Sequence, residues 1–149
     1  MTETSDMEFK NVTSPETMQD LLSFSMNWGH AFIREGYAIS PSYQLPNGKG
    51  TVNPDVPVDL FILIMTDYEE CPAVEFLFRQ VEQIEISCTS DVELQGVVIK
   101  DRFGHKYISF SFGSGRWIKA KKMEYRLLGN EILGNRRRYG QAVDHDFNY

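Results

Sequence analysis

Five short runs of β-branched and aromatic residues between positions 56 and 112 constrain this chain more than any other feature. Turns containing glycine, proline or charged residues separate the runs. Such punctuated apolar runs are typical of successive strands in one antiparallel sheet. The runs are Val56–Met65, Ala73–Phe78, Gln83–Ser87, Leu94–Lys100 and Tyr107–Phe112. The sequence therefore predicts a fold built around a sheet, with the remaining segments covering it.

One amphipathic helix is predicted ahead of these strands, from about Pro15 to Ser25, because apolar residues recur there at helical spacing. Two starts agree with the residues present. Thr13 can cap the helix with Glu16 in a capping box, or Ser14 can cap it with Pro15 at the first helical position. We expect an α+β fold, with one N-terminal amphipathic helix packed on a twisted, mainly antiparallel sheet of about six strands.

The strands differ in how clearly their places can be predicted. Val58–Thr66 is apolar at nearly every position, which favours a central strand with both faces covered. The loop Asp101–His105 contains a glycine suited to a tight turn, so the segments 94–100 and 106–112 should form a hairpin.

Three segments are irregular. Gly36 predicts a β-bulge in the strand that begins near Ala31. The alternation of apolar residues slips at 79–82, which indicates a kink between two separate strands. Segment 117–128 alternates like a strand but has the composition of a helix; we favour an edge strand whose lysines prevent wrong pairing.

We expect one domain over residues 1–149, with a loose N-terminal arm (1–12), a long connection at 40–57 and a partly ordered C-terminal tail (130–149). Alternation and helical spacing also predict which side chains form the core. These are Leu21, Leu22, Trp28, Ile33, Leu60, Ile62, Ile64, Phe76, Phe78, Ile86, Val98, Ile108 and Phe110.

Charge is divided unequally along the chain. Residues 1–98 carry sixteen Asp or Glu against four Lys or Arg, a net −12, and residues 99–149 carry five against eleven, a net +6. Such a split predicts either opposing charged surfaces or neutralisation between neighbouring strands. The polar, acidic start and two cysteines without metal or redox spacing, Cys71 and Cys88, favour a cytoplasmic protein with free thiols.

The start of the first long strand offers a candidate ligand site. His30 lies beside Trp28, precedes an apolar segment and could pair with Glu35 or Asp59 across strands. Trp28, His30 and Glu35, together with the 40–57 loop, would line a small-ligand or enzymatic site. We favour a structural histidine, because no nucleophile or phosphate-loop motif accompanies it. No metal and no cofactor are predicted.

Two charged surfaces offer other partners. Asp67, Glu69 and Glu70 cluster after the central strand and predict a contact surface for a basic protein. The segment 100–126 mixes lysines and arginines with aromatic residues, which would suit nucleic acid. The acidic chain as a whole disfavours that alternative, and no membrane segment is predicted.

The runs Trp28–Glu35 and Pro72–Ser87, followed by the hairpin, resemble small bacterial immunity-type proteins found beside polymorphic or contact-dependent toxins. Ala31 stands where those proteins often have an aspartate after the histidine. The resemblance covers roughly residues 26–112. It implies a non-catalytic protein that neutralises a toxin by stoichiometric binding, with an acidic surface presented to a basic toxin domain.

Overall fold

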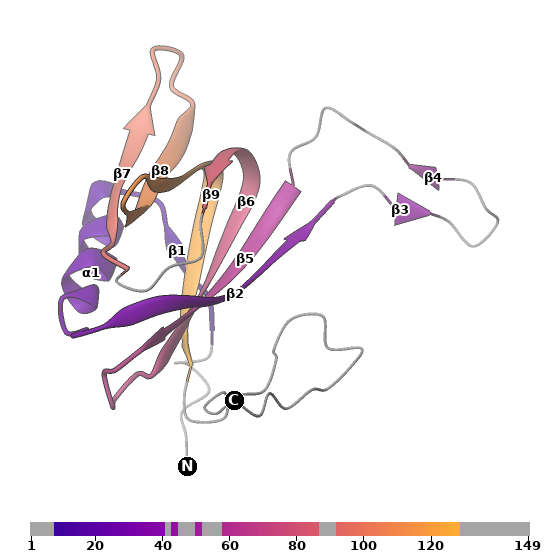
Figure 1. Cartoon of the computed structure of the whole chain (residues 1–149). Helices are drawn as coiled ribbons and strands as arrows, with labels where there is room; N and C mark the ends of the chain where they lie inside the picture. The colour runs from indigo at the N-terminus through magenta and orange to yellow at the C-terminus, as the bar shows by residue number, and fades with distance from the viewer. Residues whose placement is uncertain (1–7, 41–42, 45–49, 52–57, 87–91, 129–149) are drawn as a thin grey trace.

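The computed structural model describes residues 8–40, 43–44, 50–51, 58–86 and 92–128. Its main sheet has seven antiparallel strands in the order β2-β5-β6-β9-β8-β7, with β1 also paired to β9 (Figure 1). The strands are β1 (Lys10–Val12), β2 (Ala31–Ile39), β5 (Val58–Thr66), β6 (Ala73–Glu85), β7 (Gln95–Lys100), β8 (Lys106–Gly113) and β9 (Arg116–Leu128). Two short strands, β3 (Tyr43–Gln44) and β4 (Gly50–Thr51), pair with each other.

The single helix of the described residues, α1 (Pro15–Ser25), lies on one face of this sheet (Figure 1). Ser14 is its capping residue and Pro15 its first helical residue, with Thr17 completing the capping box. The second of the two predicted starts is therefore the observed one. The antiparallel sheet with one helix is confirmed, but the sheet has seven strands rather than about six. Strand β1 also precedes the helix, within the segment expected to be a loose arm.

The core lies between α1 and the sheet. Met18 and Leu21 of the helix are buried against it. Gly96 of β7 leaves room for the helix, because a β-carbon there would lie only 2.7 Å from both Met18 Sδ and Phe110 Cδ1. A cluster of phenylalanine rings with centroids 5.2–6.1 Å apart fills the centre, formed by Phe76, Phe78, Phe110 and Phe112.

Most of the predicted core is correct, and one residue is wrong. Eight side chains are buried as expected, namely Leu21, Leu60, Ile62, Ile64, Phe76, Phe78, Ile108 and Phe110. Leu22, Trp28, Ile33 and Val98 are partly buried against them. Ile86 is 37% exposed. It follows the part of β6 that extends past Val81, where β6 has β9 beside it but no longer β5.

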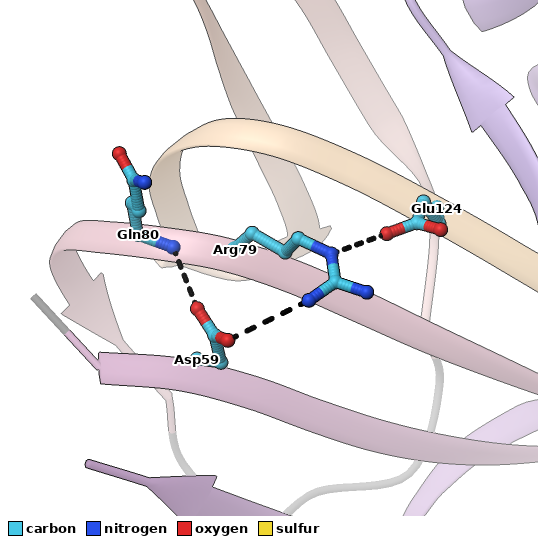
Figure 2. A network of polar contacts seen from close by, with 4 residues as sticks. All are labelled: Asp59, Arg79, Gln80 and Glu124. Atoms are coloured by element: carbon cyan, nitrogen blue, oxygen red, sulfur yellow. Dashed lines mark hydrogen bonds and ion pairs between the residues drawn. The ribbon is translucent and has the colours of Figure 1, made fainter. Parts of the chain in front are cut away.

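The predicted kink at 79–82 does not divide two strands. Residues 73–85 form one strand, β6, with an irregular register between Val81 and Gln83 and a positive φ of 54° at Gln80. Asp59 of β5 supports this bend, because its carboxylate accepts the Gln80 backbone N–H at 3.0 Å (Figure 2). Arg79 lies between Asp59, at 3.7 Å, and Glu124 of β9, to which its Nε donates at 2.7 Å. The slip in alternation is thus a bulge within a continuous strand.

Other irregular segments also differ in detail. The bulge in β2 falls at Arg34, between Ile33 and Glu35, and not at Gly36. Segment 116–128 is a strand, as favoured, but β9 is a central strand paired with β6, β8 and β1. The lysines of β9 therefore do not protect a sheet edge from wrong pairing, contrary to the prediction. The hairpin of β7 and β8 is confirmed, whereas the tail 130–149, Cys88 and most of the 40–57 connection lie outside the described residues.

Ile62→Ala should lower the free energy of unfolding by about 2–5 kcal/mol, because Ile62 is 1% exposed and its truncation leaves a cavity in the apolar core. Ile86→Ala serves as the matched control and should cost less than about 0.5 kcal/mol, since Ile86 is on the surface. Urea denaturation followed by circular dichroism measures both. Equal losses in the two variants would contradict this assignment of the core.

Candidate binding site

The C-terminal end of α1 and the turn between β5 and β6 meet at one end of the molecule. After the helix, the backbone N–H groups of Asn27 and Trp28 donate to Phe24 and Ser25 carbonyls at 3.1 Å, so the chain turns back tightly. The Phe24 ring stands edge-on to the rings of both Trp28 and Tyr68, with each pair of centroids 6.1 Å apart. This aromatic row connects the helix end to the turn at residues 66–72.

Asp67 fixes the start of β2 to the end of β5. Its carboxylate accepts the Gly29 backbone N–H at 2.8 Å, and its own backbone N–H donates to the His30 carbonyl at 3.0 Å. Hydrogen bonds from the backbone of His30 and of Gly29 lower the pKa of Asp67 below its ordinary value. A β-carbon at position 29 would lie 2.6 Å from Asp67 Oδ2, so a larger residue there would displace this carboxylate.

The turn itself is held by its own hydrogen bonds. Thr66 donates its backbone N–H to the Pro72 carbonyl at 2.8 Å and its hydroxyl to the Cys71 carbonyl at 2.9 Å. The Tyr68 hydroxyl donates to Glu70 Oε2 at 2.6 Å, which raises the pKa of Tyr68. Glu69, next to this pair, is exposed and has no side-chain hydrogen bond or ion pair within the described residues. The turn therefore holds the Glu69 and Glu70 carboxylates on a braced backbone.

A shallow depression of about 570 Å³ is lined by Gly29 and His30, to whose backbone Asp67 of the turn is hydrogen-bonded. Leu22, Met26 and Trp28 line it from the α1 side, and residues 92–94 line it from the other side. Met26 is 83% exposed. The described residues that line the depression include the carboxylate of Glu93 but no lysine or arginine. A depression lined in part by apolar side chains, with the Glu93 carboxylate at its edge, can receive an apolar side chain flanked by cations.

Trp28 has one unusual feature. Its indole Nε1–H is buried and has no hydrogen-bond acceptor in the described structure. A buried N–H without an acceptor is unfavourable, so the position of this ring is dictated by its packing against Phe24 and the core. Trp28 is thus a rigid wall of the depression.

The structure brings together most residues of two separately predicted sites, the ligand site near His30 and the acidic contact surface at Asp67. Asp67 contacts the backbone at Gly29 and His30, and Trp28 and His30 both line the depression. Glu35 does not join them. It lies opposite Leu63 in the register of β2 and β5, on the sheet face away from α1. Within residues that the structure describes, no three of the His, Cys, Asp and Glu side chains gather as a metal site would require.

Sequence reasoning missed Phe24, Met26, Tyr68 and residues 92–94 as parts of this end. Phe24 and Met26 lie at the end of the amphipathic helix pattern. That pattern does not predict that they contact another segment. The Val92 backbone N–H donates to the Ala31 carbonyl at 2.9 Å, and the Glu93 N–H donates to the Phe112 carbonyl at 3.2 Å. No local pattern in the sequence predicts these two contacts.

The basic residues of segment 100–126 do not form one continuous surface. Arg116 is 2% exposed and donates to the Gly113 and Phe112 carbonyls at 2.8 and 3.1 Å. Arg126 is paired with the buried Glu75. Lys119 lies 3.6 Å from Glu82 and 4.4 Å from the centroid of the Tyr107 ring. These three cations therefore have partners inside the molecule.

Comparison with known proteins gave no match to a family model, to a curated protein or to a solved structure. None of the described helices has the length and apolarity that crossing a membrane requires.

Asp67→Asn should lower the free energy of unfolding at about pH 7 and have little effect at about pH 2.5. The pKa of Asp67 is lowered on folding, so its stabilisation is present above its ordinary pKa and is lost as the pH falls through the lower folded-state value. Urea denaturation at both pH values measures the difference. Glu69→Gln, which removes one charge at an exposed neighbour, serves as the control. A pH-independent loss in Asp67→Asn would contradict this role of the carboxylate.

Proposed function

We propose that this protein is a non-catalytic binding module that docks a basic protein partner at the acidic end, defined as the turn 66–72 together with the adjoining depression. One observation carries the proposal. The turn that bears Glu69 and Glu70 is held by hydrogen bonds of Thr66 and Asp67, and Asp67 joins it to Gly29 at the edge of a depression that Met26 also lines.

Preorganisation makes this end suitable for docking. Ordering a mobile loop on binding costs free energy, and a turn already held by Thr66 and Asp67 avoids much of that cost. Apolar anchors seated in a depression contribute most of the affinity at protein interfaces, and the charges around them guide the encounter. A partner with an exposed apolar side chain flanked by lysines or arginines would complement Met26, Glu69 and Glu93.

The resemblance to immunity-type proteins refines the partner to a basic toxin domain, neutralised by stoichiometric binding. The net charge of −12 over residues 1–98 supports fast association with such a domain. The neighbouring reading frame in the source genome is the first partner to test, by co-expression and size-exclusion chromatography. A neighbouring gene for a metabolic enzyme, with no toxin-like gene beside it, would count against this refinement.

Replacing Glu69 and Glu70 together by lysine should slow association with that partner about tenfold or more at low salt. The electrostatic attraction reverses at the docking surface, and the effect should shrink as salt screens it. Stopped-flow fluorescence at about 20 and 200 mM salt measures the association rate. The fold should remain, because exposed charges contribute little stability.

Two controls make this experiment specific. Glu8→Lys with Glu85→Lys changes the net charge by the same amount at exposed positions outside the acidic end, and it should slow association much less. Tyr68→Phe removes the hydrogen bond to Glu70 without changing the charge. If the double reversal at 69 and 70 associates as fast as the unaltered protein at low salt, the acidic end is not the contact surface.

A further inference from the structure

A second, larger hollow lies where the β7–β8 hairpin diverges from β9. Strand β8 pairs with β9 up to Ile108 and Ala120, and β1 takes over at Val12 and Met123. Lys121 and Lys122 fall between these two pairings, so the register gives them no strand partner on that side. The hairpin projects away from the rest of the sheet in Figure 1. The space between the hairpin, β9 and β1 is a groove of about 890 Å³.

The floor of this groove is aliphatic. Its lining includes Val12, Ile108 and Met123, which are 2%, 3% and 1% exposed, and the partly buried Val98. The floor is continuous with the core beneath the helix, because all four side chains belong to the same apolar cluster. Because Val12, Ile108 and Met123 are almost fully buried, the partly buried Val98 is the floor residue whose apolar surface a ligand body can cover.

The rim of the groove carries the positive charge of three lysines. Lys106, Lys121 and Lys122 line it, are exposed, and make no side-chain hydrogen bond or ion pair within the described residues. Three like charges around one hollow repel one another, so an anion placed among them is favoured.

The carboxylates at the groove do not neutralise these lysines. Glu82 is paired with Lys119 at 3.6 Å. Asp101 accepts the backbone N–H groups of Phe103 and His105 at 2.8 and 2.9 Å, and its Oδ2 lies 3.5 Å from His105 Nδ1. Asp101 is thus bonded within the hairpin loop, and Glu82 is paired with Lys119.

We propose that this groove binds an amphipathic anion, whose aliphatic body lies on the floor and whose carboxylate or phosphate head lies among Lys106, Lys121 and Lys122. This site is separate from the acidic end and does not depend on the function proposed for it.

Two other occupants suit the groove less well. Single-stranded nucleic acid requires aromatic faces on which bases can stack. Here the floor is aliphatic, and Lys119 already covers the Tyr107 ring. A peptide added as a strand would need a longer unpaired stretch of β9, but only two residues separate the pairings of β8 and β1.

Isothermal titration calorimetry with sodium decanoate, decyl phosphate and 1-decanol, each below its aggregation concentration, tests the proposal on the full chain at low salt. Both anions should bind at one site, and the tighter of the two identifies the preferred head group. The uncharged alcohol should bind about tenfold more weakly or not at all, because it lacks the charge-assisted contacts to the lysines.

Matched variants separate the groove from general charge. Lys121→Gln with Lys122→Gln should weaken both anions about tenfold, since charge-assisted hydrogen bonds are lost. Lys100→Gln with Arg102→Gln removes the same charge from the hairpin outside the groove lining and should change affinity less than about twofold. Val98→Thr, which keeps the shape and adds a hydroxyl, should weaken decanoate several-fold. All of these positions are exposed or partly buried, so the fold should be retained.

Three kinds of result would overturn the proposal. The first is no measurable heat with either anion up to about millimolar concentration, where even weak specific binding is detectable. The second is equal binding of decanol, or undiminished binding in the variant at Lys121 and Lys122. The third is lysine-dependent binding of a ten-nucleotide oligothymidine with no binding of decanoate, which would make the hollow a nucleic-acid site.

Discussion

The antiparallel pairing of β6 with β9 is the constraint on which the rest of the sheet depends. The two strands, each of 13 residues, stay paired from Ala73 and Leu128 to Glu85 and Trp117. Because side chains alternate, one unmatched residue would turn the remainder of a strand to the wrong face. Both strands place two exposed residues at the same level, 79–80 and 121–122, between buried neighbours. Residues on both sides of the bend therefore still point their apolar side chains into the core. Next to the bend, β8 separates from β9.

The unequal distribution of charge along the sequence is partly cancelled by strand pairing. Two ion pairs across β6 and β9, Lys119–Glu82 and Arg126–Glu75, join an acidic residue of 1–98 to a basic residue of 99–149. The pair Arg79–Glu124 joins the opposite combination. The charges that remain are separated in space. Glu69 and Glu70 are exposed in the turn 66–72, whereas Lys106, Lys121 and Lys122, which have no ion pair within the described residues, line the groove. Of the two predicted outcomes of the charge split, neutralisation between neighbouring strands is observed at β6 and β9.

Local sequence patterns predicted the local structure correctly. The features that depend on long-range strand pairing could not be predicted from them. The helix, the hairpin and the strand Val58–Thr66 follow from spacing and turn residues alone. The slip near Gln80 was visible, but a bulge and a strand end look alike in sequence until a partner strand is known. The central place of β9 and the exposure of Ile86 depend on the same missing information. At the acidic end, His30 and Asp67 stood out separately; their contact depends on the register that places Ala31 opposite Thr66.

The position of β9 has a consequence for synthesis on the ribosome. It is the last strand of the described sequence, yet β6, β8 and β1 all pair with it. Until β9 emerges, those three strands each keep an unpaired edge, and the phenylalanine cluster lacks the strand between β6 and β8. Unpaired edges promote association between nascent chains. The central pairing must therefore form after translation of residue 128, joining segments that are distant in sequence, which is a slow kind of folding step.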